Sequence, residues 1–199
     1  MGGQGSLSPK EIQGRLTGGA IMFGFGIFWI AIGLSGGRFS PAWMRVGLVA
    51  AGVALATWLV ALMIRFRRSH QGTPPPTPEE EALDRQAGQR FGRINGFQWG
   101  AIVAAIIVLN VIHRTGFIAP VIAIIVGIHF FPLAPLFRQP FYYATGAAGC
   151  LIGIAGFVIA DVALRLSAVG ISFGLLLWVT VAVVLGKIVG AQAGVVRSR

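Results

Sequence analysis

Charged residues divide this 199-residue chain into six long stretches that contain none. Each stretch is close to the ~20 residues that a helix needs to cross the hydrocarbon core of a bilayer. The six stretches are Leu16 to Gly37, Val46 to Ile64, Ile94 to His113, Thr115 to Phe137, Gln139 to Ala160 and Leu166 to Gly186. The sequence therefore predicts an all-α integral membrane protein with six transmembrane helices.

The basic residues predict how these helices are oriented. Arg65, Arg67 and Arg68 directly follow the second stretch, and the positive-inside rule places such a cluster in the cytoplasm, together with both termini. Twelve of the 16 Lys and Arg residues then lie inside and four outside. We interpret the net charge of +10 as a signal that sets the topology and that attracts membrane lipids with anionic headgroups on the cytoplasmic side. We do not interpret it as a sign of nucleic-acid binding. The predicted location is the plasma (inner) membrane if the chain is bacterial.

The six spans are predicted to form three helical hairpins. In 69–93, Thr77-Pro78-Glu79-Glu80 is a capping box that favours a short amphipathic helix on the membrane surface between the second and third spans. The predicted organisation is a cytoplasmic N-terminal segment (1–15), a first transmembrane hairpin (16–68), a cytoplasmic Pro-rich linker with the surface helix (69–93), a second hairpin (94–138), a third hairpin (139–190) and a cytoplasmic tail (191–199).

The fourth stretch contains the one histidine that lies well inside an uncharged run. His129 is followed by Pro132 and Pro135, and each proline removes a backbone N–H, which predicts a kinked helix. An imidazole in the middle of a spanning helix needs a polar partner. Two interpretations stay open: a core histidine that is hydrogen-bonded to a neighbouring helix, or a group that binds a solute or carries protons.

Two functional hypotheses follow. The first is a transporter or channel subunit for a small solute or ion, with a site near the kinked fourth helix, because broken helices form such sites in membranes. Its candidate ligand or proton-site residues are His129, Asn110, Thr145, Tyr142 and Tyr143. The alternative is a non-catalytic membrane protein that packs with itself, as a homo-oligomer, or with a membrane partner through glycine-rich helix faces.

The remaining polar residues give little support for catalysis. Asp161 and Arg165 are four residues apart at the predicted outer end of the fifth span, a spacing typical of an intrahelical ion pair, with a proton or cation site as the alternative. Cys150 is the single cysteine, so no thiolate metal site is predicted. We expect no metal and no cofactor. The common hydrolase and ATPase motifs are absent, and the sequence leans against an enzyme.

Overall fold

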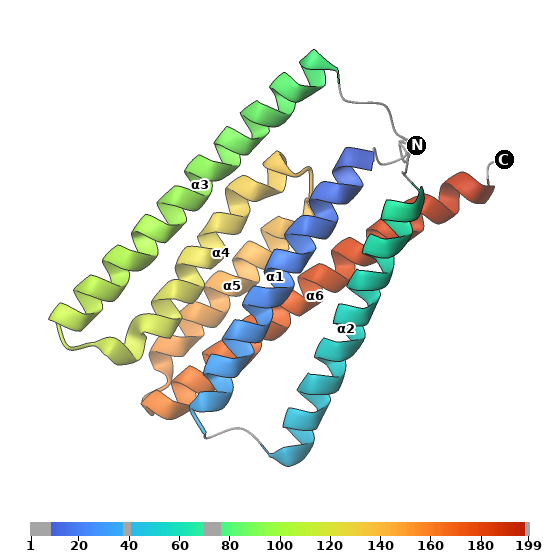
Figure 1. Cartoon of the computed structure of the whole chain (residues 1–199). Helices are drawn as coiled ribbons and strands as arrows, with labels where there is room; N and C mark the ends of the chain where they lie inside the picture. The colour runs from blue at the N-terminus through green and yellow to red at the C-terminus, as the bar shows by residue number, and fades with distance from the viewer. Residues whose placement is uncertain (1–8, 38–40, 70–76, 198–199) are drawn as a thin grey trace. The chain divides into compact units, whose positions relative to one another are not determined.

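The computed structural model describes residues 9–37, 41–69 and 77–197, and all of the regular structure there is helical (Figure 1). The Pro-rich core of the predicted linker, residues 73–76, lies outside the described residues. The elements are α1 (Pro9–Ser35), α2 (Ala42–Ser69), α3 (Pro78–Val111), a short 3-10 helix η1 (Thr115–Phe117), α4 (Ile118–Leu136), α5 (Phe141–Val158) and α6 (Val162–Arg197).

The six α-helices are long and apolar enough to cross a membrane. Each corresponds to one of the six uncharged stretches, so the predicted all-α class with six such helices is confirmed. Insertion itself and the cytoplasmic location of both termini stay predictions.

Helix α3 differs from the expectation of a separate surface helix. It runs without interruption over 34 residues, so the segment predicted to lie on the membrane surface is the first half of α3. Gly88 and Gly92 each cost about 1 kcal/mol relative to Ala, but no proline interrupts the helix after Pro78, which occupies its first position. At 1.5 Å per residue α3 is about 51 Å long, well beyond the ~30 Å of a hydrocarbon core.

The chain forms two compact units. The first contains α1 up to Ile27, α2, and α6 from Leu177 onwards. On α2 the buried residues recur at intervals of three and four, from Leu48 to Leu62, which forms one apolar stripe.

Trp178 lies at the centre of the first unit. Its indole Nε1 donates a hydrogen bond to the Phe23 carbonyl at 3.3 Å, and its ring stacks on Phe23 with 5.7 Å between centroids. On the other side, a Cβ added to Gly52 would lie 2.8 Å from the indole. The glycine therefore makes room for the large ring.

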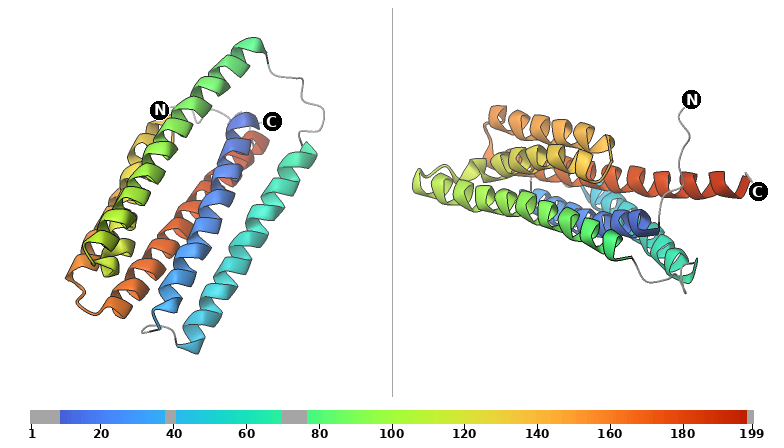
Figure 2. Two further views of the ribbon diagram at one scale, coloured as in Figure 1. Left: turned by 60° about the vertical axis from the view of Figure 1, so that its left-hand side comes forward. Right: turned by 90° about the horizontal axis from the view of Figure 1, so that it is seen from above.

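The second unit contains α1 from Phe28, α3, η1, α4, α5, and α6 up to Leu176. Figure 2 shows α3 and α4 side by side in both views. The α5 glycines, including Gly149, Gly153 and Gly156, are buried, and α4 and α5 make the most extensive helix contact described. At the crossing of α1 with α6, a Cβ on Gly170 would lie 2.6 Å from the Gly33 Cα. Close backbone approach through glycine is thus the main packing device of this unit.

Candidate functional site

His129 lies on α4, on the side that faces α3. Its imidazole interacts with the backbone of Ile94 on α3. Its Nδ1 atom is buried and has no hydrogen-bond partner among the described residues. The ring lies edge-on to Phe130, with 6.3 Å between centroids. His129 is therefore part of the α3–α4 interface, with one ring nitrogen unsatisfied.

The contact with Ile94 also shows which part of α3 the imidazole lies beside. Ile94 directly follows Arg93, the last charged residue before the third uncharged stretch. The ring therefore reaches the end of that stretch and not its middle. Asn95 and Gln98 are half-buried on α3 near this point, and sequence reasoning had not selected them.

Pro132 and Pro135 lie inside α4, which stays helical as far as Leu136. Their missing N–H groups leave the carbonyls of Ile128 and Phe131 without the usual helical donor. The kink itself stays a prediction.

Tyr142 and Thr145 are buried on α5. The Tyr142 ring packs edge-on against Phe130 at 5.5 Å and Phe137 at 6.4 Å between centroids. The Thr145 hydroxyl donates to the Phe141 carbonyl of its own helix at 3.3 Å. These contacts give both side chains a packing role.

Tyr143 and Asn110 lie on exposed surfaces. The Tyr143 ring is 6.2 Å from that of Phe131. The Asn110 amide nitrogen donates to the carbonyl of Ile106, one turn earlier in α3, at 2.8 Å. Asn110 comes sixteen residues after Ile94, about 24 Å further along the helix, so it is remote from the imidazole of His129.

The structure does not gather the five candidate residues in one place. Helix α5 packs on the face of α4 that contains Gly127, where an added Cβ would lie 2.7 Å from the Cys150 nitrogen. His129 is two residues further on, about 200° around the helix. Tyr142, Tyr143 and Thr145, which belong to α5, and His129 therefore lie on opposite sides of α4.

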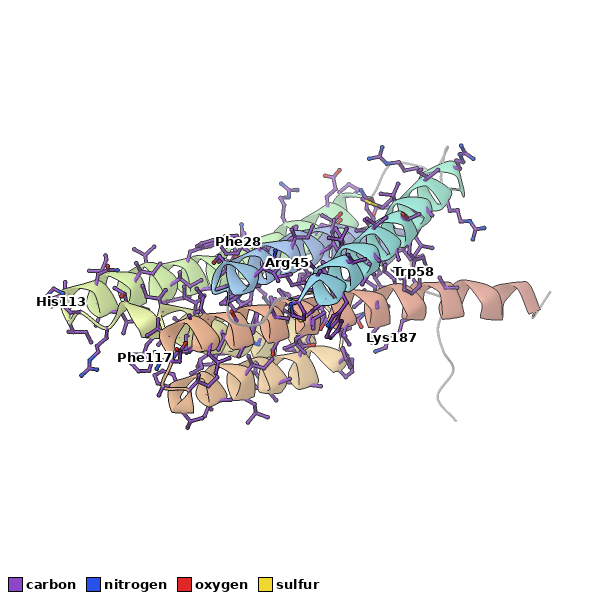
Figure 3. The ribbon with its side chains drawn as sticks, turned by 90° about the horizontal axis from the view of Figure 1, so that it is seen from below. Phe28, Arg45, Trp58, His113, Phe117 and Lys187 are labelled. Carbon is purple, nitrogen blue, oxygen red and sulfur yellow. The ribbon has the colours of Figure 1, made fainter. Side chains whose placement is uncertain are left out.

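Arg165, at the start of α6, is a buried charge with several backbone partners. It is only 5% exposed. Its Nε and Nη2 atoms donate to the Ile159 carbonyl at 2.9 and 2.6 Å, with a longer 3.4 Å contact from Nη2 to Ala160. Nη1 donates to the Gly116 carbonyl at 3.2 Å, and the guanidinium lies 4.0 Å from the ring centroid of Phe117. Figure 3 labels Phe117 beside the first turns of α6. One side chain thus joins the α3–α4 and α5–α6 connections.

Asp161 stands just before α6 and not inside a helix. Its Oδ1 accepts the N–H of Leu164 at 2.7 Å, which is an N-cap hydrogen bond. The backbone N–H of Arg165 donates to the Asp161 carbonyl at 2.9 Å. The ion pair between the two side chains stays a prediction.

The glycines of α3 differ from those of α5. Gly88, Gly92, Gly96 and Gly100 recur every four residues along the helix, and nothing described lies within 4 Å of a Cβ added to any of them. A shallow, open groove includes the last two of these glycines and is lined by Arg93, Gly96, Phe97, Gly100, Ala101 and Ala104. We call it the α3 groove. The interval of four is visible in the sequence and is the signal that could have identified this face.

No metal centre is formed by the described residues. They contain no group of three or more His, Cys, Asp or Glu side chains that could hold a metal ion. A second shallow surface hollow lies beside Glu81, Asp84 and Arg85.

These features place the chain in the class of all-helical proteins with six helices suited to crossing a membrane. No protein-family model, curated protein or solved structure matches the chain. Its own geometry is therefore what bears on its function.

Proposed function

We propose that this chain is a non-catalytic membrane assembly protein, whose α3 packs against another transmembrane helix through the α3 groove. The observation that carries this proposal is the contrast between two glycine-rich helix faces of one chain. One face is filled and the other is open.

The α5 face shows what such glycines do when a helix is packed on them. A Cβ added to Gly153 would lie 2.7 Å from the Pro120 carbonyl oxygen of α4, and one added to Gly149 would lie 2.9 Å from the Phe173 ring of α6. Only glycine permits this approach, which gives helices in lipid the close van der Waals contact that holds them together.

The α3 glycines recur at intervals of four, where those of α5 recur at intervals of three and four, and they lack such a contact. In the most apolar 18-residue segment of α3 only 6% of the residues are buried, whereas in that of α6 56% are buried. Four glycines in one helix cost about 1 kcal/mol of helix stability each relative to alanine. No packing against these glycines within the described residues offsets that cost. A second helix in the groove would supply that packing.

The test compares glycine-to-leucine substitutions in native membranes. Gly96→Leu fills the groove, whereas Gly47→Leu on α2 is a matched control, because Gly47 is also exposed with nothing described within 4 Å. Protein mass is measured by light scattering after mild detergent extraction. We expect wild type and Gly47→Leu to exceed the 21.0 kDa of one chain, and Gly96→Leu to fall towards it. Equal masses for all three would refute the proposal.

The second candidate function is transport of a small solute or ion near His129. The observation that favours it is the buried Nδ1 without a described hydrogen-bond partner, since a bound solute could supply one. In liposomes, wild type should then carry a flux of protons, ions or small metabolites that His129→Gln loses. Equal flux for the two proteins would remove this candidate.

A further inference from the structure

Most of the net charge of the chain belongs to the first unit. That unit contains nine Lys and Arg residues and one Glu, a formal net charge of +8. The second unit contains seven Arg residues and five Asp and Glu residues, a net charge of +2. Helix α2 contains no acidic residue at all. The first unit is therefore the part of the chain that attracts anions most strongly.

The cations of the first unit gather mainly at one end of its helices. A Cβ added to Gly19 of α1 would lie 3.8 Å from Leu59 of α2 and 3.9 Å from Val181 of α6, so the three helices meet at this level. Figure 1 shows the start of α1 and the last turns of α2 and α6 at the same end of the unit. The basic side chains of this end include Arg15, Arg65, Arg67, Arg68 and Lys187.

One face of α2 joins an apolar surface to two of these cations. Its large apolar side chains are between 45% and 68% exposed. They are Val46, Val49, Val53, Val60 and Ile64. Thr57 fills the gap in this row, and its hydroxyl donates to the Val53 carbonyl at 2.8 Å. Arg67 and Arg68 are exposed and follow Ile64 by three and four residues, so they continue the same side of the helix. We call this surface the α2 valine face.

The two parts of the α2 valine face match the two parts of a phospholipid. Val53 and Ile64 are eleven residues apart, about 16 Å along the helix and half of a ~30 Å hydrocarbon core. A guanidinium offers parallel N–H donors that fit a phosphate group. An acidic peptide would match the arginines but not the valines, and a neutral lipid would leave the positive charge of the arginines without a counter-charge.

From the continuity of this apolar face with the two arginines, we infer that the α2 valine face binds a phospholipid whose headgroup carries a net negative charge. An acyl chain lies along Val53, Val60 and Ile64, and the phosphate lies at Arg67 and Arg68. Helix α3 offers no equivalent, because residues 78–93 contain four acidic and three basic side chains. The inference requires that α2 is inserted in a membrane, and it is independent of what occupies the α3 groove.

Quenching by nitroxide-labelled lipids tests the inference on the full chain. In a Cys150→Ala background, Val60→Cys carries a fluorophore on the α2 valine face. Leu151→Cys carries it on α5, at a side chain that is also exposed but on a helix without charged residues. Each protein is reconstituted in phosphatidylcholine vesicles that contain a small fraction of nitroxide-labelled phosphatidylglycerol or nitroxide-labelled phosphatidylcholine. The ratio of the two quenching efficiencies measures the local preference for the anionic lipid.

We expect position 60 to favour the anionic lipid by about fivefold, roughly what one basic residue near a membrane surface contributes, and position 151 to show no preference. Equal quenching by the two lipids at position 60 would overturn the inference in protein that keeps both arginines. Quenching by neither lipid at position 60, with normal quenching at position 151, would also overturn it, because a protein would then cover the face.

Two double variants then assign the preference to the arginines. Arg67→Gln with Arg68→Gln should bring the ratio at position 60 close to that at position 151. Arg85→Gln with Arg90→Gln removes the same number of charges from exposed positions on α3 and should leave the ratio unchanged. A ratio that survives the first pair of substitutions, or that falls equally with the second, would overturn the inference.

Discussion

Replacing Arg165 tests whether one buried guanidinium holds two helix connections together. Arg165→Met keeps an unbranched apolar side chain but removes every donor, so the carbonyls of Ile159 and Gly116 lose their bonds to the guanidinium. Those carbonyls lie in the α5–α6 and α3–α4 connections. We expect a clear loss of stability.

The magnitude follows from the contacts. A hydrogen bond to a charged group contributes about 1.5–3 kcal/mol net, and the two short bonds to the single Ile159 acceptor are counted once. The longer bond to Gly116 adds about 1 kcal/mol, and the contact with the Phe117 ring about 1 kcal/mol. Removal of the buried charge also relieves part of its desolvation cost. The expected net loss for Arg165→Met is therefore about 3 kcal/mol.

Arg165→Lys separates the charge from the shape of the guanidinium. An ammonium keeps the positive charge but cannot donate in parallel to Ile159 while reaching Gly116. The lysine variant should therefore recover less than half of the loss. Arg114→Met is the matched control, because Arg114 is an exposed arginine near the same connection and its removal should leave stability nearly unchanged.

Reversible unfolding of the purified protein in mixed micelles, titrated with a denaturing detergent, gives the free energy of unfolding for all four proteins. A lysine variant within about 1 kcal/mol of wild type would show that charge alone suffices, since that difference is smaller than one charged hydrogen bond. A methionine variant as stable as wild type would refute the reasoning altogether.

Three further substitutions test the packing, each followed by the same unfolding measurement. Gly153→Ala should destabilise by about 1–3 kcal/mol, because its methyl group would overlap a main-chain carbonyl of α4. Gly170→Ala should lose a similar ~1–3 kcal/mol by separating α1 from α6; stability within error of wild type would contradict the backbone contact at that crossing. Trp178→Phe should lose about 1 kcal/mol or more from its hydrogen bond to an α1 carbonyl, and a neutral effect would count against that bond. Gly47→Ala, with open space around it, is the control and should be neutral or stabilising by up to ~1 kcal/mol.

The sequence predicts the helices well because each interval between charged residues is about as long as a membrane-spanning helix. The end of α5 and the start of α6, inside the third hairpin, were harder to predict. Asp161 and Arg165 have the i,i+4 spacing of a helical pair, but α5 ends at Val158 and α6 starts at Val162, so Asp161 caps a new helix. One acceptor of Arg165 also lies beyond any local rule, because Gly116 is 49 residues earlier in the chain.

The candidate site was less predictable because it depends on how neighbouring helices are aligned. Sequence position alone puts His129 in the middle of an uncharged run. Its contact with Ile94 follows from how α4 is shifted along α3, and no pattern in either helix specifies that shift. The α3 glycines were a different case. Helix propensity counts Gly88 and Gly92 against a helix, although with Gly96 and Gly100 they recur regularly at intervals of four.

The contacts at the two ends of α4 explain how a helix as little buried as α3 can still present a defined face. At one end, Arg165 bonds the Gly116 carbonyl and covers Phe117, immediately after α3. At the other end, Phe91 of α3 packs edge-on against Phe137, with 5.8 Å between ring centroids. The aromatic contact joins α3 to the end of α4, and the Arg165 contacts hold the connection between the two helices. A surface oriented in advance loses less conformational freedom on association. The partner that we propose for the α3 groove would therefore meet a helix that is already in contact with α4.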